Sequence, residues 1–153
     1  VPDLHVHCVD PWCLIGSTAA LLLGAQASAA DVDVLTSRAD AETLMAIWAS
    51  QRETAFTPPD AGRFRSHFAR FRFPGAAVEI MGALEVHADD RWQAVSPGRL
   101  VLVGVNGLAV PVPSLDDQIR LFKSFGREKD MRHAEALRAL TPAAFTIPVL
   151  SSR

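Results

Sequence analysis

Residues 12–35 decide the fold of this chain. Their sequence is Trp-Cys-Leu-Ile-Gly-Ser-Thr-Ala-Ala-Leu-Leu-Leu-Gly-Ala-Gln-Ala-Ser-Ala-Ala-Asp-Val-Asp-Val-Leu. The apolar run 12–15 predicts a short buried strand, and Gly16-Ser17 predicts a turn. Residues 18–23 predict a short helix that ends at Gly24. A second apolar strand begins after a loop of small residues. The stretch therefore predicts two strands joined by a short helix.

Two carboxylates, Asp31 and Asp33, lie on the second of these strands. Because side chains alternate along a strand, both point to one side, while Val32 and Val34 enter the core. Mg²⁺ prefers oxygen ligands and typically takes one or two carboxylates together with substrate phosphates. Backbone N–H groups of the Gly16-Ser17 turn, at the start of a helix, suit such phosphates. The pattern favours a metal and phosphate site; the alternative is that the two acids only cap the entrance of a strand.

Composition bounds the class of protein. The chain has 153 residues, of which 49% are hydrophobic, and this suits one domain with its own core. Its formal net charge of −2 excludes a generally basic nucleic-acid coat. The longest apolar runs are far shorter than the roughly 20 residues of a membrane span, and the N-terminus lacks the plan of a signal peptide. We therefore expect a cytoplasmic protein in which Cys8 and Cys13 are reduced thiols, with Cys13 in the core.

Residues 1–11 precede the deciding stretch, and we treat them as an N-terminal extension. The run 3–7, Asp-Leu-His-Val-His, is similar to the opening strand of the polymerase-and-histidinol-phosphatase metal hydrolases, in which a His-x-His pair binds metal. A zinc site is a second interpretation, although the spacing fits none of the usual paired-ligand patterns. Its ligands would be His5, His7, Cys8 and Cys13. We favour a third interpretation, a strand or tail with incidental histidines, because the three other histidines of the chain are isolated.

The order of strand, Gly-Ser turn, short helix and Asp-x-Asp strand resembles the signature of the polymerase-beta-like nucleotidyltransferase superfamily. The residues that carry the resemblance are Gly16, Ser17, Asp31 and Asp33. It implies an α+β fold, a small mixed β-sheet with helices packed on it, followed by a C-terminal helical pair. We expect one domain, with a sheet core over 12–112, helices over 113–141 and a tail over 142–153.

A third acid is expected at Glu79, inside the apolar strand 76–81. A glutamate is costly to bury unless it is paired or coordinates metal, so Glu79 should meet a cation. In the resembled superfamily a third carboxylate, usually Asp, serves as general base or second-metal ligand, and Glu79 matches that position. Glu85 is the fallback, and a solvent-facing Glu79 is the alternative. The loop 26–30 departs from the family, because it lacks the Arg or Thr that relatives often carry there.

Residues 63–73 interleave four arginines with four phenylalanines. They predict an edge strand with Phe inward and Arg outward, and a bend between Phe68 and Phe71. Basic residues beside aromatic ones could instead bind a nucleotide or a single nucleic-acid strand.

Further along, Asn106-Gly107 predicts a hairpin. Capping boxes at 37–40 and 114–117 predict helix starts. The inward residues expected on the later helices are Leu44, Ile47, Trp48, Leu115, Ile119, Phe122, Met131, Ala134, Leu137 and Leu140.

A second resemblance lies near the C-terminus. Lys123 and Arg127 are four residues apart and are expected to share one helix face, with Lys129 at the start of the next helix. Residues 112–130 resemble the C-terminal segment of small bacterial nucleotidyltransferases related to abortive-infection toxin and antitoxin proteins. In that branch a Lys on this helix and a Lys-Asp pair after it line the nucleotide site. The alternative for Lys123 and Arg127 is a solvated helix face. Residues 145–150 predict one more strand or a docking surface.

Together the resemblances imply a nucleotidyltransferase that moves a nucleoside monophosphate from a nucleoside triphosphate to a hydroxyl acceptor. The expected metal ligands and catalytic residues are Asp31, Asp33 and Glu79, with Mg²⁺ or Mn²⁺ as the ion. The expected triphosphate ligands are Gly16, Ser17, Lys123, Arg127 and Lys129. The acceptor would be a protein, an RNA or a small molecule such as an aminoglycoside, and further partners a second copy or a toxin-antitoxin partner. The alternatives are a catalytically degenerate nucleotide-binding or antitoxin-like module and the His-x-His metal hydrolase.

Overall fold

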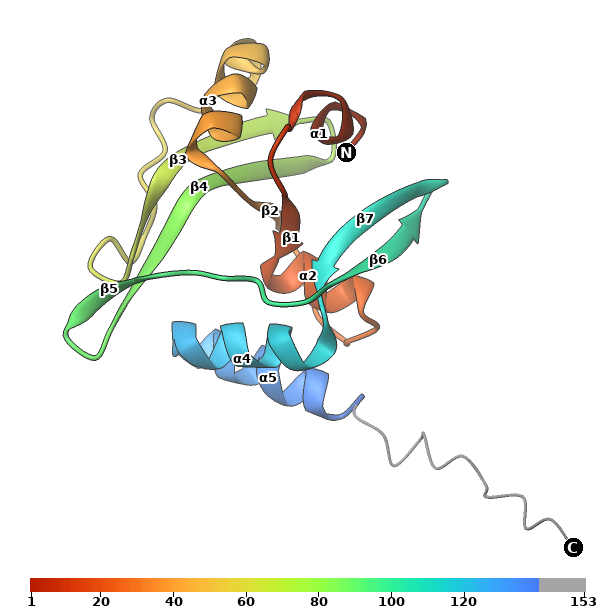
Figure 1. The fold of residues 1–153 in the computed structure, drawn as a ribbon, viewed down its shortest axis with the longest axis vertical. Helices are drawn as coiled ribbons and strands as arrows, with labels where there is room; N and C mark the ends of the chain where they lie inside the picture. Colours follow the sequence, from red (N-terminus) through yellow and green to blue (C-terminus); the bar gives the residue numbers. More distant parts are fainter. Residues whose placement is uncertain (141–153) are drawn as a thin grey trace, which may run out of the picture.

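The computed structural model describes residues 1–140, which fold as a mixed β-sheet, a separate hairpin and helices on both sides (Figure 1). In chain order the elements are α1 (Pro2–His7), β1 (Cys13–Ile15), α2 (Gly16–Leu22), β2 (Asp31–Thr36), α3 (Arg38–Ile47), the 3₁₀ helix η1 (Ala49–Gln51), β3 (Phe64–Phe73), β4 (Ala76–Ala88), β5 (Arg91–Ala94), β6 (Leu100–Val105), β7 (Leu108–Pro113), α4 (Leu115–Phe125) and α5 (Glu128–Arg138). The α+β fold with a C-terminal helical pair is confirmed. No helix within residues 1–140 is both long and apolar enough to cross a membrane. The strand or docking surface expected over 145–150 lies outside the described residues.

The sheet has the strand order β1-β2-β4-β3, and β5 pairs with β4. β2 and β4 run parallel, whereas the other pairs are antiparallel. The register places one row of side chains across four strands, namely Ile15, Asp33, Glu79 and Arg70. Two residues further along, the next row is Cys13, Leu35, Met81 and Phe68. A polar row therefore lies beside an apolar row on one face of the sheet.

Each face of the sheet has its own core. The face that carries these two rows packs against α4 and α5 through Leu121, Phe122 and Leu137. The opposite face packs against α3 and the hairpin through Leu44, Val110 and residues of β2 and β3. Figure 1 shows the same arrangement, with α1 and α3 on one side of the sheet and α4 and α5 on the other. The polar row is thus enclosed between the sheet and the C-terminal helices.

Local sequence signals explain several of these elements. The Ser37 and Ser114 hydroxyls accept hydrogen bonds from the N–H groups of Asp40 and Asp117, as the two capping boxes predict. The hairpin turn at Asn106-Gly107 has positive φ at both residues, which is the type I′ geometry that this pair favours. These three predictions are confirmed.

The N-terminal segment corrects the expectation of a strand or tail, because it forms the helix α1. At about 100° per residue, His5 and His7 point to nearly opposite sides of a helix and cannot form a His-x-His metal pair. The His5 ring packs against Trp12, with 5.2 Å between the ring centroids. Within residues 1–140 no three His, Cys, Asp or Glu side chains are placed to hold a metal ion, which counts equally against the zinc interpretation.

Three further details differ from the sequence-based predictions. Ile47 and Met131 are 42% and 43% exposed, because Trp48 and Asp130 take the inward positions beside them. The irregularity of β3 lies between Arg65 and His67, since β4 carries the extra residue there and Ala83 has a φ of 51°. Helix α4 ends at Phe125, and the left-handed residue Gly126 separates it from α5. Lys123 and Arg127 therefore do not share a helix face.

Both cysteines are protonated thiols at neutral pH. Cys13 is buried in the core as predicted, and burial raises its pKa to about 12. Burial also raises the pKa of Cys8 to about 11, with a smaller contribution from the charge of Asp40. Neither forms a disulfide.

The N-terminal segment is attached to α3 by a buried acid. The carboxylate of Asp40, 2% exposed, accepts hydrogen bonds from the N–H groups of Val9 at 3.1 Å and Asp10 at 2.8 Å. In addition, the Trp48 indole N–H donates to Asp3 at 2.8 Å. These contacts fix the chain just before β1 and so fix where β1 enters the sheet.

We predict that Asp40→Ala lowers the free energy of unfolding by about 1–3 kcal/mol, because two backbone donors lose their buried acceptor. Urea denaturation followed by circular dichroism would measure this. Glu42→Ala on the exposed side of the same helix is the control and should change stability by less than about 0.5 kcal/mol. Equal effects of the two substitutions would contradict the anchoring role.

Candidate active site

The turn between β1 and α2 lies directly against Asp33. Gly16 has a φ of 70°, and a Cβ atom built there would be 2.6 Å from Asp33 Oδ2. Only glycine fits this backbone conformation and this close approach without a shift. The Thr18 hydroxyl donates to the Asp31 carbonyl at 2.8 Å, which ties α2 to β2. The Gly-Ser turn and the Asp-x-Asp strand are therefore brought together, as the sequence predicts.

The acids of β2 and β4 meet a guanidinium group. Arg70 donates from Nη1 to Glu79 Oε1 at 2.6 Å and from Nη2 to Asp31 Oδ1 at 3.1 Å. Its Nε donates to Glu53 Oε2 at 3.0 Å, and the group lies 4.5 Å from the centre of the Phe56 ring. Glu79 thus meets a cation, as its apolar surroundings predict, and does not face solvent. The Arg70 side chain is only 12% exposed, so the expectation that the arginines of 63–73 point outward fails at this position.

Asp33 has the most strongly perturbed carboxyl group of the site. Burial raises its pKa to about 8, helped by the charge of Glu79, a hydrogen bond between the two carboxyl groups and the charge of Asp31; the charge of Lys129 acts in the opposite direction. Asp33 Oδ1 is buried and has no hydrogen-bond partner among residues 1–140. In the metal-free site one guanidinium and one proton therefore hold three carboxyl groups together.

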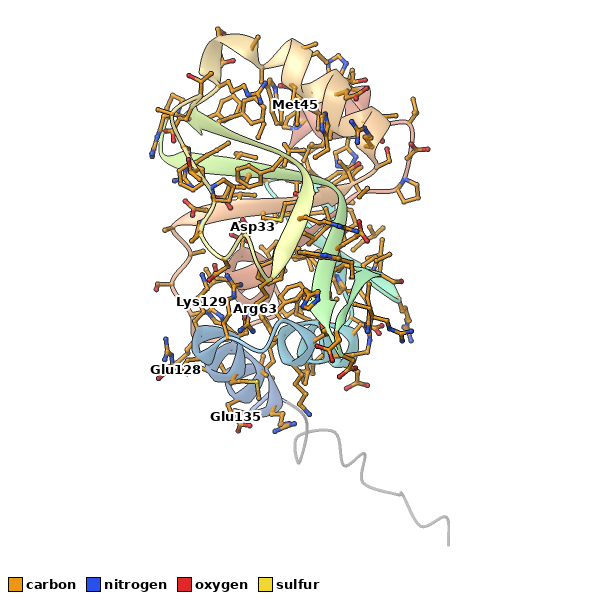
Figure 2. The ribbon with its side chains drawn as sticks, turned by 90° about the vertical axis from the view of Figure 1, so that its left-hand side faces the viewer. Asp33, Met45, Arg63, Glu128, Lys129 and Glu135 are labelled. Atoms are coloured by element: carbon orange, nitrogen blue, oxygen red, sulfur yellow. The ribbon has the colours of Figure 1, made fainter. Side chains whose placement is uncertain are left out.

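These groups line a cavity of about 530 Å³ between the sheet and α5. Its polar wall consists of Gly16, Ser17, Asp31, Asp33, Arg70 and Glu79. Its apolar wall includes Phe56, Phe64, Phe68, Met81, Phe122 and Phe125. The helix α5 contributes Lys129, Asp130 and His133, with Arg127 just before it. Figure 2 shows Asp33 on β2 and Lys129 at the start of α5 on the same side of the molecule.

The basic residues expected around a triphosphate are in different situations. Lys129 lines the cavity, and no ion pair involves it within residues 1–140. Arg127 also lines the cavity but is paired, at 2.7 Å from Asp130 and 3.2 Å from Asp60. Lys123 is exposed on α4 and does not line the cavity. The fallback acid Glu85 pairs with Arg65 at 3.0 Å, outside the cavity.

Sequence reasoning missed three residues of this cavity, Arg70, Phe56 and His133. His133 follows Lys129 by four residues, so helical periodicity places both on one face of α5. The His133 ring packs on Phe122 at 5.0 Å, and its buried Nδ1 has no hydrogen-bond partner within the described residues. Arg70 could have been found only from the register, since its partner Glu79 lies on the neighbouring strand.

The residues present fit a divalent metal ion of the Mg²⁺ or Mn²⁺ type. The unpaired buried oxygen of Asp33 lies beside the glycine turn, and carboxylate oxygens are the ligands that such ions prefer. As they stand, no three of the described acids are placed around a common point, because Arg70 lies between Asp31 and Glu79. The donor set is therefore suitable, and part of it is engaged by the guanidinium.

Comparison with known proteins identifies the fold. No protein-family model and no curated protein matches the sequence. Among solved structures, a protein from Thermotoga maritima assigned as a nucleotidyltransferase is 25% identical over 90% of this chain and 85% of its own, with a TM-score of 0.69. The lincosamide antibiotic adenylyltransferase LnuA, solved with lincomycin bound, is 13% identical over 92% of this chain and 93% of its own, with a TM-score of 0.58. An antigenic nucleotidyltransferase-like protein from Paracoccidioides brasiliensis is 16% identical over 91% of this chain and 72% of its own, with a TM-score of 0.54.

The chain thus has the nucleotidyltransferase fold, and the predicted superfamily resemblance is confirmed at this level. The three structures do not single out the abortive-infection branch.

The raised pKa of Asp33 predicts how the stability of the metal-free protein depends on pH. The unfolded carboxyl loses its proton near 3.8 and the folded one near 8. Between these values the folded state holds the extra proton, so stability should fall as pH rises. Asp33→Asn removes this dependence, and its stability advantage over the wild type should grow from about pH 5 to about pH 8 and then level off.

Urea denaturation in the presence of a chelator, at several pH values, would measure the difference. Asp116→Asn on the exposed start of α4 is the control and should give a difference that does not vary in this way. A constant difference between Asp33→Asn and the wild type would show that Asp33 is ionised throughout.

Proposed function

We propose that this protein transfers a nucleoside monophosphate from a nucleoside triphosphate to a hydroxyl group of an acceptor. The observation that carries the proposal is the contact of the Gly16 turn with Asp33. Asp33 lies in one row with Glu79, and Lys129 lines the same cavity. Phosphate-binding backbone, metal-binding acids and a cation are the parts that nucleotidyl transfer requires. The fold neighbours, which are named as nucleotidyltransferases, support the same reaction class.

Asp31 and Asp33 would hold a divalent metal ion, Mg²⁺ or Mn²⁺, with Glu79 beside them. When bound, the ion supplies Lewis-acid chemistry, which stabilises negative charge on the phosphoryl oxygens. To serve as a ligand, Asp33 would have to be deprotonated, although its pKa is raised in the protein. Gly16 and Ser17 would position the triphosphate beside these acids.

Glu79 is the residue that we propose as general base. The acceptor oxygen attacks the α-phosphorus of the triphosphate, and the hydroxyl proton passes to the Glu79 carboxylate. A new P–O bond forms, the bond from the α-phosphorus to its bridging oxygen breaks, and pyrophosphate leaves. Lys129, which is not engaged in an ion pair within residues 1–140, would offset the charge of the phosphates.

For the acceptor, the apolar wall favours a small molecule with an apolar part over an RNA end or a protein hydroxyl. Met81 follows Glu79 by two residues on the same face of β4, and Phe68 is its partner on β3. An acceptor whose hydroxyl group lies beside Glu79 would therefore place its apolar part against Met81 and Phe68. A polycationic acceptor would need unpaired acids, but Glu53 and Asp60 near this wall are bound to arginines.

Two further elements of the proposal rest on resemblance. The C-terminal run 112–130 suggests a toxin-antitoxin partner or a second copy of the chain. A catalytically degenerate nucleotide-binding or antitoxin-like module of the same fold is the alternative function. It would bind nucleotide with metal but transfer nothing, which the following experiment detects.

The test of the proposal is transfer of label from each of the four α-³²P-labelled nucleoside triphosphates to molecules of a bacterial lysate separated by size. We expect transfer with one of the four, release of pyrophosphate, and loss of both with Asp31→Ala. Label should enter the small-molecule fraction. Tight nucleotide binding without any transfer would favour the degenerate module.

Lys129 and Lys123 provide a matched pair for the triphosphate site. Lys129→Ala should weaken nucleotide binding at least tenfold, because one charge-assisted contact contributes about 1.5–3 kcal/mol. Lys123→Ala should leave the affinity close to that of the wild type, since Lys123 lies outside the cavity. Isothermal titration calorimetry with a non-hydrolysable triphosphate would measure both. A tenfold loss with Lys123→Ala instead would return this residue to the site, as the sequence alone predicts.

A further inference from the structure

We propose that Arg70 takes the place of a second divalent ion, so that this site works with one metal ion rather than two. The inference rests on the proposed function and extends it to the number of ions and to the residue that replaces one of them. Arg70 lies in the row of Asp33 and Glu79, and its guanidinium joins the carboxylates of Glu79 and Asp31.

The guanidinium bonds the acids in the manner of a shared cation. It donates to Glu79 Oε1 and to Asp31 Oδ1 through its two Nη atoms, and so joins the strands β4 and β2. A guanidinium has five N–H donors, and the three hydrogen bonds to Asp31, Glu79 and Glu53 use one each. The two remaining donors belong to the Nη atoms, in a residue that lines the cavity. Their planar arrangement suits two oxygens of one phosphoryl group.

Arg70 is also held from behind, so an arriving ion would not easily displace it. Its Nε is bonded to Glu53, which in turn is bonded to Arg72 at 2.6 Å. The face of the guanidinium lies over the Phe56 ring at 4.5 Å. Because the side chain is only 12% exposed, these contacts are poorly screened by solvent. The group is a fixed part of the cavity wall and not a surface arginine that has folded inward.

The remaining donor atoms suffice for one ion. Asp31 Oδ1 and Glu79 Oε1 are engaged by Arg70, whereas Asp33 Oδ1 is buried and has no partner in the part of the chain that the structure describes. When ionised, Asp31, Asp33 and Glu79 carry a charge of −3, which one divalent ion and Arg70 balance. Glu53, which also contacts Arg70, is paired with Arg72. A second divalent ion between Asp31 and Glu79 would lie against the guanidinium, and like charges repel strongly at this burial. Asp33 would therefore hold one metal ion, and Arg70 would supply the second positive charge for the phosphoryl group.

The experiment counts Mn²⁺ ions in the complex of the protein with a non-hydrolysable α,β-methylene nucleoside triphosphate. Free Mn²⁺ is measured by electron paramagnetic resonance, and bound nucleotide by calorimetry on the same samples. The wild type should bind one Mn²⁺ per nucleotide. Arg70→Met, which removes the charge but keeps the bulk of the side chain, should bind two. Arg70→Gln serves the same purpose if the methionine variant does not fold.

Arg72→Met is the matched control, because Arg72 shares Glu53 with Arg70 but does not line the cavity. It should bind one Mn²⁺, as should Arg70→Lys, which retains a positive charge. Two ions in the wild type would overturn the inference while leaving the proposed function intact. One ion in both Arg70→Met and Arg70→Gln would overturn it as well, since Arg70 would then exclude nothing. Absence of any metal-dependent nucleotide binding would overturn the proposed function and this inference together.

Discussion

The parallel pairing of β2 with β4 is the constraint on which the site depends. It places Asp33 opposite Glu79, and the antiparallel β3 then places Arg70 opposite Glu79 from the other side. A shift of one residue in either pairing would turn these side chains to the other face of the sheet, into the core below α3. That core is filled by residues such as Val34, Ile80 and Phe71, which are fully buried. Hydrophobic packing on one face thus holds the polar row in register on the other.

Burial of several acids side by side is unfavourable unless their charge is offset. In this protein the offset comes from two sources. One is the guanidinium of Arg70, and the other is the proton that Asp33 retains because burial raises its pKa to about 8. Only the second is exchangeable. If the site holds a divalent ion, as we propose, it can fold before the ion binds, and only the proton of Asp33 would then have to leave.

The sequence was informative where a local pattern determines the structure. The Gly16 turn, the shared side of Asp31 and Asp33 and the need of Glu79 for a cation all follow from neighbouring residues. The pairing of Arg70 with Glu79 and Asp31 could not be foreseen, because it depends on which strand lies next to β4 and in which register. The same holds for Phe56, which reaches the cavity from a loop. Lys123 and Arg127 have the spacing of one helix face, but the left-handed residue Gly126 ends α4 between them.

The state of the two cysteines has a practical consequence for studying this protein in solution. The chain has only Cys8 and Cys13; Cys13 is buried and Cys8 half-buried, and the pKa of each thiol is raised, which lowers the fraction of reactive thiolate at neutral pH. A cysteine introduced on the exposed surface would consequently react faster with a maleimide or a nitroxide reagent than either native thiol. Dyes or spin labels can be attached at chosen positions on α4 or α5 without first removing the native cysteines, so the distance between these helices and the sheet can be followed as nucleotide and metal are added.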